Sequence, residues 1–190
     1  MIAFVLRWLL QLDRPVPPRS EAEIAAEVER HYRWNFVVNL LDGVFFWFGL
    51  SFASSTTILP LFISKLTTST LPIGLVAVIA QSGWFLPQLL TANAVERLAR
   101  KKPVIVNLGF FTERLPLLLF VPAALVAGRS PLLAIALLLG GYAGHAVGAG
   151  VVATAWQDLI ARCFPVNRRG RFFGLTAFLG AGTGSCSSTK

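Results

Sequence analysis

The chain has 190 residues, of which 55% are hydrophobic and 14% are charged, and its mean hydropathy is +0.66. A soluble domain usually has about 25% charged residues and no long apolar run, so this composition excludes an ordinary soluble domain. The net charge of +8 does not indicate a nucleic-acid partner, because the basic residues lie in short segments between apolar runs, as they do in membrane proteins.

The apolar runs are about 20 residues or longer, the length that a helix needs to cross roughly 30 Å of hydrocarbon. Inside lipid every backbone amide must be bonded within its own helix or within a closed barrel. The runs lack the alternation of polar and apolar residues that barrel strands have. The sequence therefore predicts an all-α integral membrane protein whose main partner is the lipid bilayer.

Residues 1–34 are expected to form an arm that precedes the membrane-spanning region. Met1–Leu12 is apolar but interrupted by Arg7, and it is too short to span a bilayer. It predicts an amphipathic helix in the membrane interface. A second, polar helix is predicted to begin at Ser20, because Ser20 and Glu23 match the capping-box pattern.

Four complete spans and an incomplete fifth are predicted within a membrane domain of residues 35–184. The four spans are expected at about residues 36–63, 72–95, 103–127 and 131–159. The fifth covers residues 172–184 and is followed by a polar tail, residues 185–190. About 13 apolar residues cannot complete a crossing, so we expect the fifth helix to be cut off.

The basic residues between the spans predict the orientation of the chain. Eight of them lie between spans 2 and 3 or between spans 4 and 5, whereas the other two connections hold only Lys65 and Arg129. Because cytoplasmic loops are enriched in Lys and Arg, we expect a multi-pass protein of the cell (inner or plasma) membrane with a cytoplasmic N-terminus. The eight residues are Arg97, Arg100, Lys101, Lys102, Arg162, Arg168, Arg169 and Arg171.

The segment between spans 2 and 3 reads ANAVERLARKK over residues 92–102. It resembles the signature loop of the major facilitator superfamily, which runs glycine, three residues, aspartate, arginine, any residue, glycine and two basic residues. Ala92 and Ala99 stand at the two glycine positions. The acidic position is held by Glu96, and the basic positions are held by Arg97, Arg100 and Lys101.

A second segment, residues 164–174, reads FPVNRRGRFFG and is similar to the arginine–glycine–arginine cluster that opens the fifth span in many members of that superfamily. The resemblance implies most of the N-terminal six-helix half of a twelve-helix secondary transporter, which moves a small solute by alternating access. It also implies a missing C-terminal half, without which this chain is expected to be inactive. The arginine motif of the fourth span in that family has no counterpart here, where His145 is the ionisable residue.

The charged residues of these two segments are candidates for a cytoplasmic latch that differs between inward-open and outward-open states. The alternative is that they only set topology. The latch candidates are Glu96, Arg97, Arg100, Lys101, Asp158, Arg162, Arg168, Arg169 and Arg171.

Five polar residues within the predicted spans are candidates for a pathway, because a charge at membrane depth costs at least about 2.5 kcal/mol and usually faces a cavity or a partner. They predict a substrate or ion pathway, with a bridge between Arg114 and Asp42 as the preferred pair. The alternative is a structural ion-pair network. The residues are Asn39, Asp42, Glu113, Arg114 and His145.

The spacing of Gly140, Gly144 and Gly148 predicts a close helix approach in the fourth span. No zinc-protease, nucleophile-elbow or phosphate-loop pattern is present, so we expect neither an enzyme nor a metal or cofactor. A second hypothesis for function is a small multi-span interaction or assembly subunit without transport activity.

Overall fold

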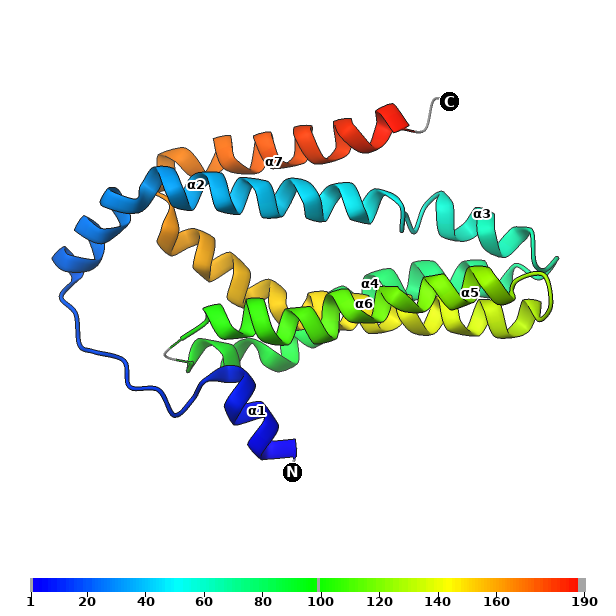
Figure 1. Ribbon diagram of the computed structural model, residues 1–190, viewed down its shortest axis with the longest axis horizontal. Helices are drawn as coiled ribbons and strands as arrows, with labels where there is room; N and C mark the ends of the chain where they lie inside the picture. Colours follow the sequence, from blue (N-terminus) through cyan, green and yellow to red (C-terminus); the bar gives the residue numbers. More distant parts are fainter. Residues whose placement is uncertain (1, 99, 188–190) are drawn as a thin grey trace. The chain divides into compact units, whose positions relative to one another are not determined.

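The computed structural model describes residues 2–98 and 100–187, and the regular structure of these residues is entirely helical (Figure 1). The expectation of an all-helical chain is thereby confirmed for the described residues. The α-helices are α1 (Ile2–Leu10), α2 (Glu21–Ser51), α3 (Ile58–Ser64), α4 (Leu71–Glu96), α5 (Phe120–Val126), α6 (Pro131–Cys163) and α7 (Val166–Ser187). Between α4 and α5 lie three shorter elements, η1 (Val104–Leu108), η2 (Phe110–Arg114) and η3 (Leu115–Leu119).

The chain divides into two compact units. The first unit combines Met1–Val16 with Ser55–Gln157, and the second combines Pro17–Ser54 with Asp158–Lys190.

Three helices in the described part of the chain are long and apolar enough to cross a membrane, as expected of a membrane protein. They are Leu71–Glu96, Val104–Val126 and Pro131–Cys163. These helices coincide with the second, third and fourth expected spans, although Pro131–Cys163 extends beyond the expected end at residue 159.

The first expected span, residues 36–63, is not a single helix. Its first part belongs to α2, which begins in the N-terminal arm and ends at Ser51, and α3 begins only at Ile58. The connection contains Ser54, Ser55, Thr56 and Thr57, whose hydroxyls compete with the helix for backbone bonds. The apolar part of α2 therefore extends over only about 16 residues, or roughly 24 Å, which is shorter than the hydrocarbon core.

The capping box at the start of α2 forms as the sequence predicts. The Glu23 backbone N–H donates to Ser20 Oγ over 3.3 Å, and the Ser20 backbone N–H donates to Glu23 Oε2 over 2.9 Å. The Ser20 backbone N–H, followed by the Ser20 hydroxyl, lowers the pKa of the Glu23 carboxyl below its ordinary value. The helix runs from this cap through residue 34 without a break, so the arm and the first apolar segment share one helix.

In the first unit, α6 is the central helix, and it contacts its neighbours on two faces through small residues. On one face, a Cβ atom added to Gly144 would lie 2.8 Å from Pro116 Cβ, and one added to Gly148 would overlap the Thr112 carbonyl. On the other face, a Cβ atom on Gly150 would lie 2.7 Å from the Trp84 carbonyl oxygen of α4. Without a hydrophobic drive between helices in lipid, such close packing is a main source of association.

The expected stripe Gly140–Gly144–Gly148 is wrong at its first position. A Cβ atom on Gly140 would meet no other group, whereas one on Gly141 would lie 2.8 Å from the Pro116 carbonyl oxygen. A straight spacing of four drifts around a helix of 3.6 residues per turn, so the residue that faces Pro116 is one position later.

Larger side chains close the same unit near α3. Leu59 and Ile63 of α3 are buried together with Val76 of α4, Ala123 of α5 and Leu138 of α6. A smaller cluster joins Val95, Val104 and Ala155. The two clusters therefore pack α3, α4, Val104–Val126 and α6 against one another within this unit.

In the second unit, α2 lies along α7 (Figure 1). Gly43 of α2 faces Thr176, and Gly180 of α7 faces Trp47. The helix α7 begins at Val166, earlier than the expected residue 172, and runs through the expected end at residue 184 to Ser187. Residues 188–190 of the expected polar tail lie outside the described residues.

Two glycines on α6 give a matched test of this packing. Gly148→Ala should lower the free energy of unfolding by about 1–3 kcal/mol, because the added methyl group overpacks against the backbone of the third span. Gly140→Ala should leave it unchanged or raise it slightly, because alanine is the better helix former. Thermal unfolding of both variants in detergent measures this, and equal midpoints would contradict the packing.

The capping box predicts a pH dependence for the first turn of α2. Because the folded-state pKa of Glu23 is lowered from 4.5, the stability that the box contributes is fully present above pH 4.5 and is lost as the pH falls through the lower folded value. An NMR titration of the Glu23 carboxyl in micelles should give a higher pKa in Ser20→Ala than in the wild type. The same Glu23 pKa in both proteins would contradict the hydrogen bond between Ser20 and Glu23 in the cap.

Candidate functional site

The helix Val104–Val126, which coincides with the third expected span, is irregular along most of its length. Its η1 and η2 segments are π-helical, and η3 is a 3-10 helix. Pro116 sits at the start of η3, where it has no N–H to donate to the preceding turn and its ring excludes regular α-helical packing. Because π-helical segments are rare and often occur at functional sites, this helix is the strongest candidate for the location of a functional site.

His145 of α6 binds the backbone of this irregular segment. Its Nδ1 atom lies 2.8 Å from the carbonyl oxygen of Glu113, the residue before last in η2. A carbonyl oxygen can only accept, so Nδ1 carries the proton and donates it. In the neutral ring, Nε2 is therefore the basic nitrogen.

Both partners of this bond are buried. The His145 side chain is only 5% exposed, and Glu113 is 8% exposed. A buried carbonyl that loses its hydrogen bond costs about 1–3 kcal/mol, so the histidine stabilises the departure of the third span from α-helical geometry. Gly148, one turn further along α6, provides the close approach that brings the ring within reach.

Of the five predicted pathway residues, the structure joins His145 to the backbone carbonyl of Glu113 within the first unit. Arg114 ends η2 and is half-buried. Asn39 of α2 donates through Nδ2 to the Asn35 carbonyl over 2.7 Å, and Asp42 is exposed on the same helix. Since Asp42 and Arg114 belong to different units, a bridge between them stays a prediction.

The latch candidates after α4 are distributed around its end. Glu96 is the exposed last residue of α4, Arg97 is the C-cap, and Lys101 is half-buried. Arg100 donates through Nη2 to the Pro15 carbonyl over 2.8 Å. Within the first unit, Arg100 therefore ties the segment that follows α1 to the connection after α4, a role that the sequence did not predict.

Two of the latch candidates, Asp158 and Arg162, form an ion pair with 2.8 Å between Oδ2 and Nε. Both residues lie on α6, four positions apart. A partly exposed pair of this kind contributes little to stability. It joins two turns of one helix, so this pair alone cannot latch two helices together.

The basic cluster expected in a loop before the fifth span lies instead on the first turns of α7. Arg169 donates through Nε to the Phe164 carbonyl over 3.0 Å and through Nη2 to the Ala161 carbonyl over 2.5 Å. Arg168 lies over the Tyr32 ring, with 4.6 Å from Cζ to the ring centroid. Arg171 is exposed. The connection from α6 to α7 is a two-residue turn, and Arg169 caps the last carbonyls of α6.

An aromatic cluster supports this turn. The Phe164 and Phe172 rings stack with centroids 4.8 Å apart, and Phe36 of α2 meets both rings edge-on. Phe164 and Phe172 are among the largest fully buried side chains. The cluster fixes the turn between α6 and α7 against α2 within the second unit.

Two further polar residues, Asn107 and Thr154, were not predicted as site residues, because no side-chain pattern in the sequence marks them. Asn107 of η1 donates through Nδ2 to the Leu9 carbonyl of α1 over 2.7 Å. The buried hydroxyl oxygen of Thr154 has no hydrogen-bond partner within the described residues. In the same part of the chain, no group of three or more His, Cys, Asp or Glu side chains lies close enough to hold a metal ion.

Comparisons with protein-family models, with curated proteins and with solved structures find no match to this chain.

The arginine cap of α6 can be tested through the neighbouring Cys163, which ends that helix and is half-buried. In a Cys186→Ser background, Arg169→Gln should destabilise the end of α6 by roughly 1–2 kcal/mol, because two charged hydrogen bonds are lost. Alkylation of Cys163 should then be about tenfold faster. Arg171→Gln, which removes an exposed arginine from the same turn, is the control, and equal rates in both variants would exclude the cap.

Proposed function

We propose that this chain is part of a secondary transporter of the major facilitator type, corresponding to its N-terminal half, that moves a small solute by alternating access. The pathway side chains are Glu113, Arg114 and His145, together with Asn39 and Asp42 of α2. The loop resemblance at Glu96–Lys101 and around Arg168–Arg171 supports the family, and the membrane-length helices support its setting in a bilayer.

The observation that carries this proposal is the hydrogen bond from His145 to the broken third span. Transporters place substrate and ion sites where membrane helices are interrupted and unwound backbone lines a cavity. Ionisable residues at membrane depth usually mark such pathways. An interrupted helix, a buried carboxyl-bearing residue and a buried histidine occur together here.

The geometry also provides a way to change charge without breaking the contact. A proton or a polar solute group that binds at Nε2 leaves the Nδ1–H donor in place, because the imidazolium donates from both nitrogens. The bond to the Glu113 carbonyl then persists in both charge states. Because a charged donor makes a stronger hydrogen bond than a neutral one, a proton at Nε2 strengthens the contact between His145 and the π-helical turn.

We further propose that the N-terminus is cytoplasmic in the cell membrane, since the basic residues gather at the ends of α4, α6 and α7. In this orientation the Arg169 cap and the Asp158–Arg162 pair lie on the cytoplasmic side. The Arg169 cap holds the turn between α6 and α7 in one shape while the helices move.

The test is uptake by the complete gene product in proteoliposomes, with labelled sugars, amino acids, organic acids and organic cations as the solutes. His145→Gln should lower the uptake of the transported class by at least about tenfold, because glutamine can still donate to the Glu113 carbonyl but cannot titrate. His31→Gln makes the same chemical change at an exposed position of α2, and its uptake should stay within about twofold of the wild type.

Equal uptake by the two histidine variants would remove His145 from the pathway. A correctly inserted wild type that moves none of the four solute classes, and that purifies in a fixed ratio with another membrane protein, would instead support the interaction-subunit hypothesis.

A further inference from the structure

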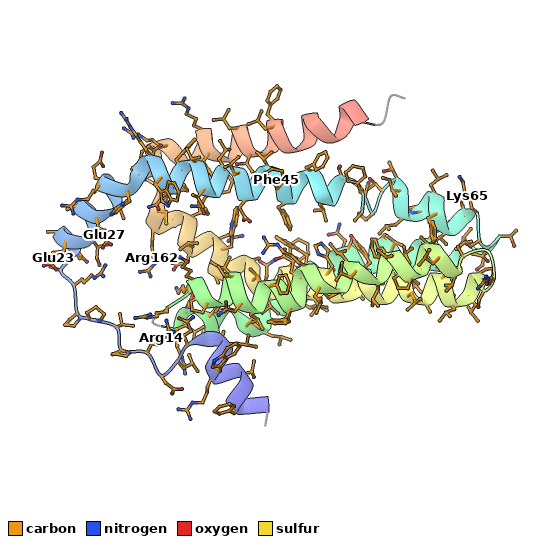
Figure 2. The ribbon with its side chains drawn as sticks, in the orientation of Figure 1. Arg14, Glu23, Glu27, Phe45, Lys65 and Arg162 are labelled. Atoms are coloured by element: carbon orange, nitrogen blue, oxygen red, sulfur yellow. The ribbon has the colours of Figure 1, made fainter. Side chains whose placement is uncertain are left out.

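A cavity of about 430 Å³ lies in the first unit, between α1 and the π-helical part of the third span. Trp8 and Phe111 provide aromatic walls. Figure 2 labels Arg14, which lies in the segment that follows α1 and lines this cavity. The polar side chains that line it are Arg7, Gln11, Asp13, Arg14 and Asn107.

The walls of the cavity are held in place by bonds that do not use its arginines. Asn107 donates to the Leu9 carbonyl over 2.7 Å, and Arg100 donates to the Pro15 carbonyl over 2.8 Å. Leu9 is buried, and Leu10 packs against the cluster around Val104. The end of α1 is therefore a fixed part of the first unit.

The turn at the end of α1 has an unusual residue at its left-handed position. The Gln11 N–H donates to the Trp8 carbonyl over 3.2 Å, and the Leu12 N–H donates to the Arg7 carbonyl over 3.1 Å, which is the Schellman pattern. Gln11 has a φ of 52°, where glycine is the usual residue and a side chain carries a steric cost. The Gln11 side chain lines the cavity, which gives a reason for glutamine at this position.

The side chains that line the cavity carry a net positive charge, because two arginines lie against one aspartate. Arg7 Nη2 lies 3.6 Å from Asp13 Oδ1, and their side chains are 65% and 73% exposed, so this pair is loose. Arg14 adds a second guanidinium. Arginine forks match the geometry of phosphate oxygens and bind them with two parallel hydrogen bonds.

The exposed side of α1, next to the cavity, carries large aromatic side chains. Phe4 is 75% exposed and Trp8 is 71% exposed. Exposed aromatic side chains beside basic residues are typical of helices that lie in the headgroup region of a membrane. A phosphate at this depth comes with acyl chains that cover those aromatic rings.

We propose that this cavity binds the phosphate of an anionic phospholipid. Arg7 and Arg14 hold the phosphate oxygens, the Gln11 amide bonds the headgroup, and Trp8 packs against the upper acyl chain. The bound lipid joins α1 to the start of the third span through the Asn107 contact. This site is separate from His145 and does not depend on transport.

The experiment measures the binding of short-chain phosphatidylglycerol to the purified chain in micelles by native mass spectrometry. Phosphatidylcholine and inorganic phosphate are the comparison ligands. Phosphatidylglycerol should bind at least about tenfold more tightly than phosphatidylcholine, whose choline charge is repelled by the net positive cavity. Arg7→Gln/Arg14→Gln should lose at least about tenfold in affinity, whereas Arg30→Gln/Arg129→Gln, which removes two exposed charges elsewhere, should stay within about twofold.

A Gln11→Gly variant keeps the test independent of folding. It relieves the left-handed strain, so its thermal midpoint should equal or exceed that of the wild type, while its phosphatidylglycerol affinity falls several-fold because the amide is gone. Equal binding of the two lipids, or equal losses in the two double variants, would overturn the site. Inorganic phosphate that displaces the lipid at equal concentration would show a site for free phosphate and would overturn the lipid assignment.

Discussion

The bond from His145 to the Glu113 carbonyl is the contact on which the first unit depends. A helix that contains π-helical and 3-10 turns leaves backbone groups without their regular partners, and in lipid no water replaces those partners. Pro116 removes one donor at the same place. The histidine on the neighbouring helix compensates for this loss, which makes the irregular geometry of the third span stable rather than a defect.

The composition of α6 follows from that contact. A histidine ring can reach the backbone of another helix only if the two helices approach closely, and Gly141, Gly144 and Gly148 permit this. The opposite face uses Ala146 and Gly150 against α4. A helix with small residues on two faces and one buried ring between them packs closely against both neighbours.

The sequence predicted the features that local chemistry determines. Helix type, the capping box at Ser20 and the extent of the second span all depend on residues that are near one another in the chain. The prediction of one continuous helix over residues 36–63 was wrong. Apolar content alone does not reveal that the hydroxyl-bearing residues 54–57 interrupt the helix. The basic cluster before α7 was placed in a loop because an arginine that caps the preceding helix has the same sequence signature as a loop arginine.

In the candidate site too, the sequence predicted which residues matter but not the contact that they make with each other. His145 and Glu113 were selected as ionisable residues at membrane depth, but their contact uses a backbone carbonyl, which no side-chain pattern reveals. Pro116 was the available signal, because a proline inside a membrane helix frees carbonyls one turn earlier. The turn at Gln11 was missed for a related reason, since glycine normally marks a left-handed position.

Solid-state NMR of the protein in lipid bilayers, with ¹⁵N-labelled histidine and a ¹³C-labelled Glu113 carbonyl in a His31→Gln background, tests the central contact most directly. The account predicts a protonated Nδ1 on His145 in the neutral ring and a cross peak from that nitrogen to the Glu113 carbonyl carbon. A neutral ring protonated at Nε2, with no cross peak to Glu113, would contradict it.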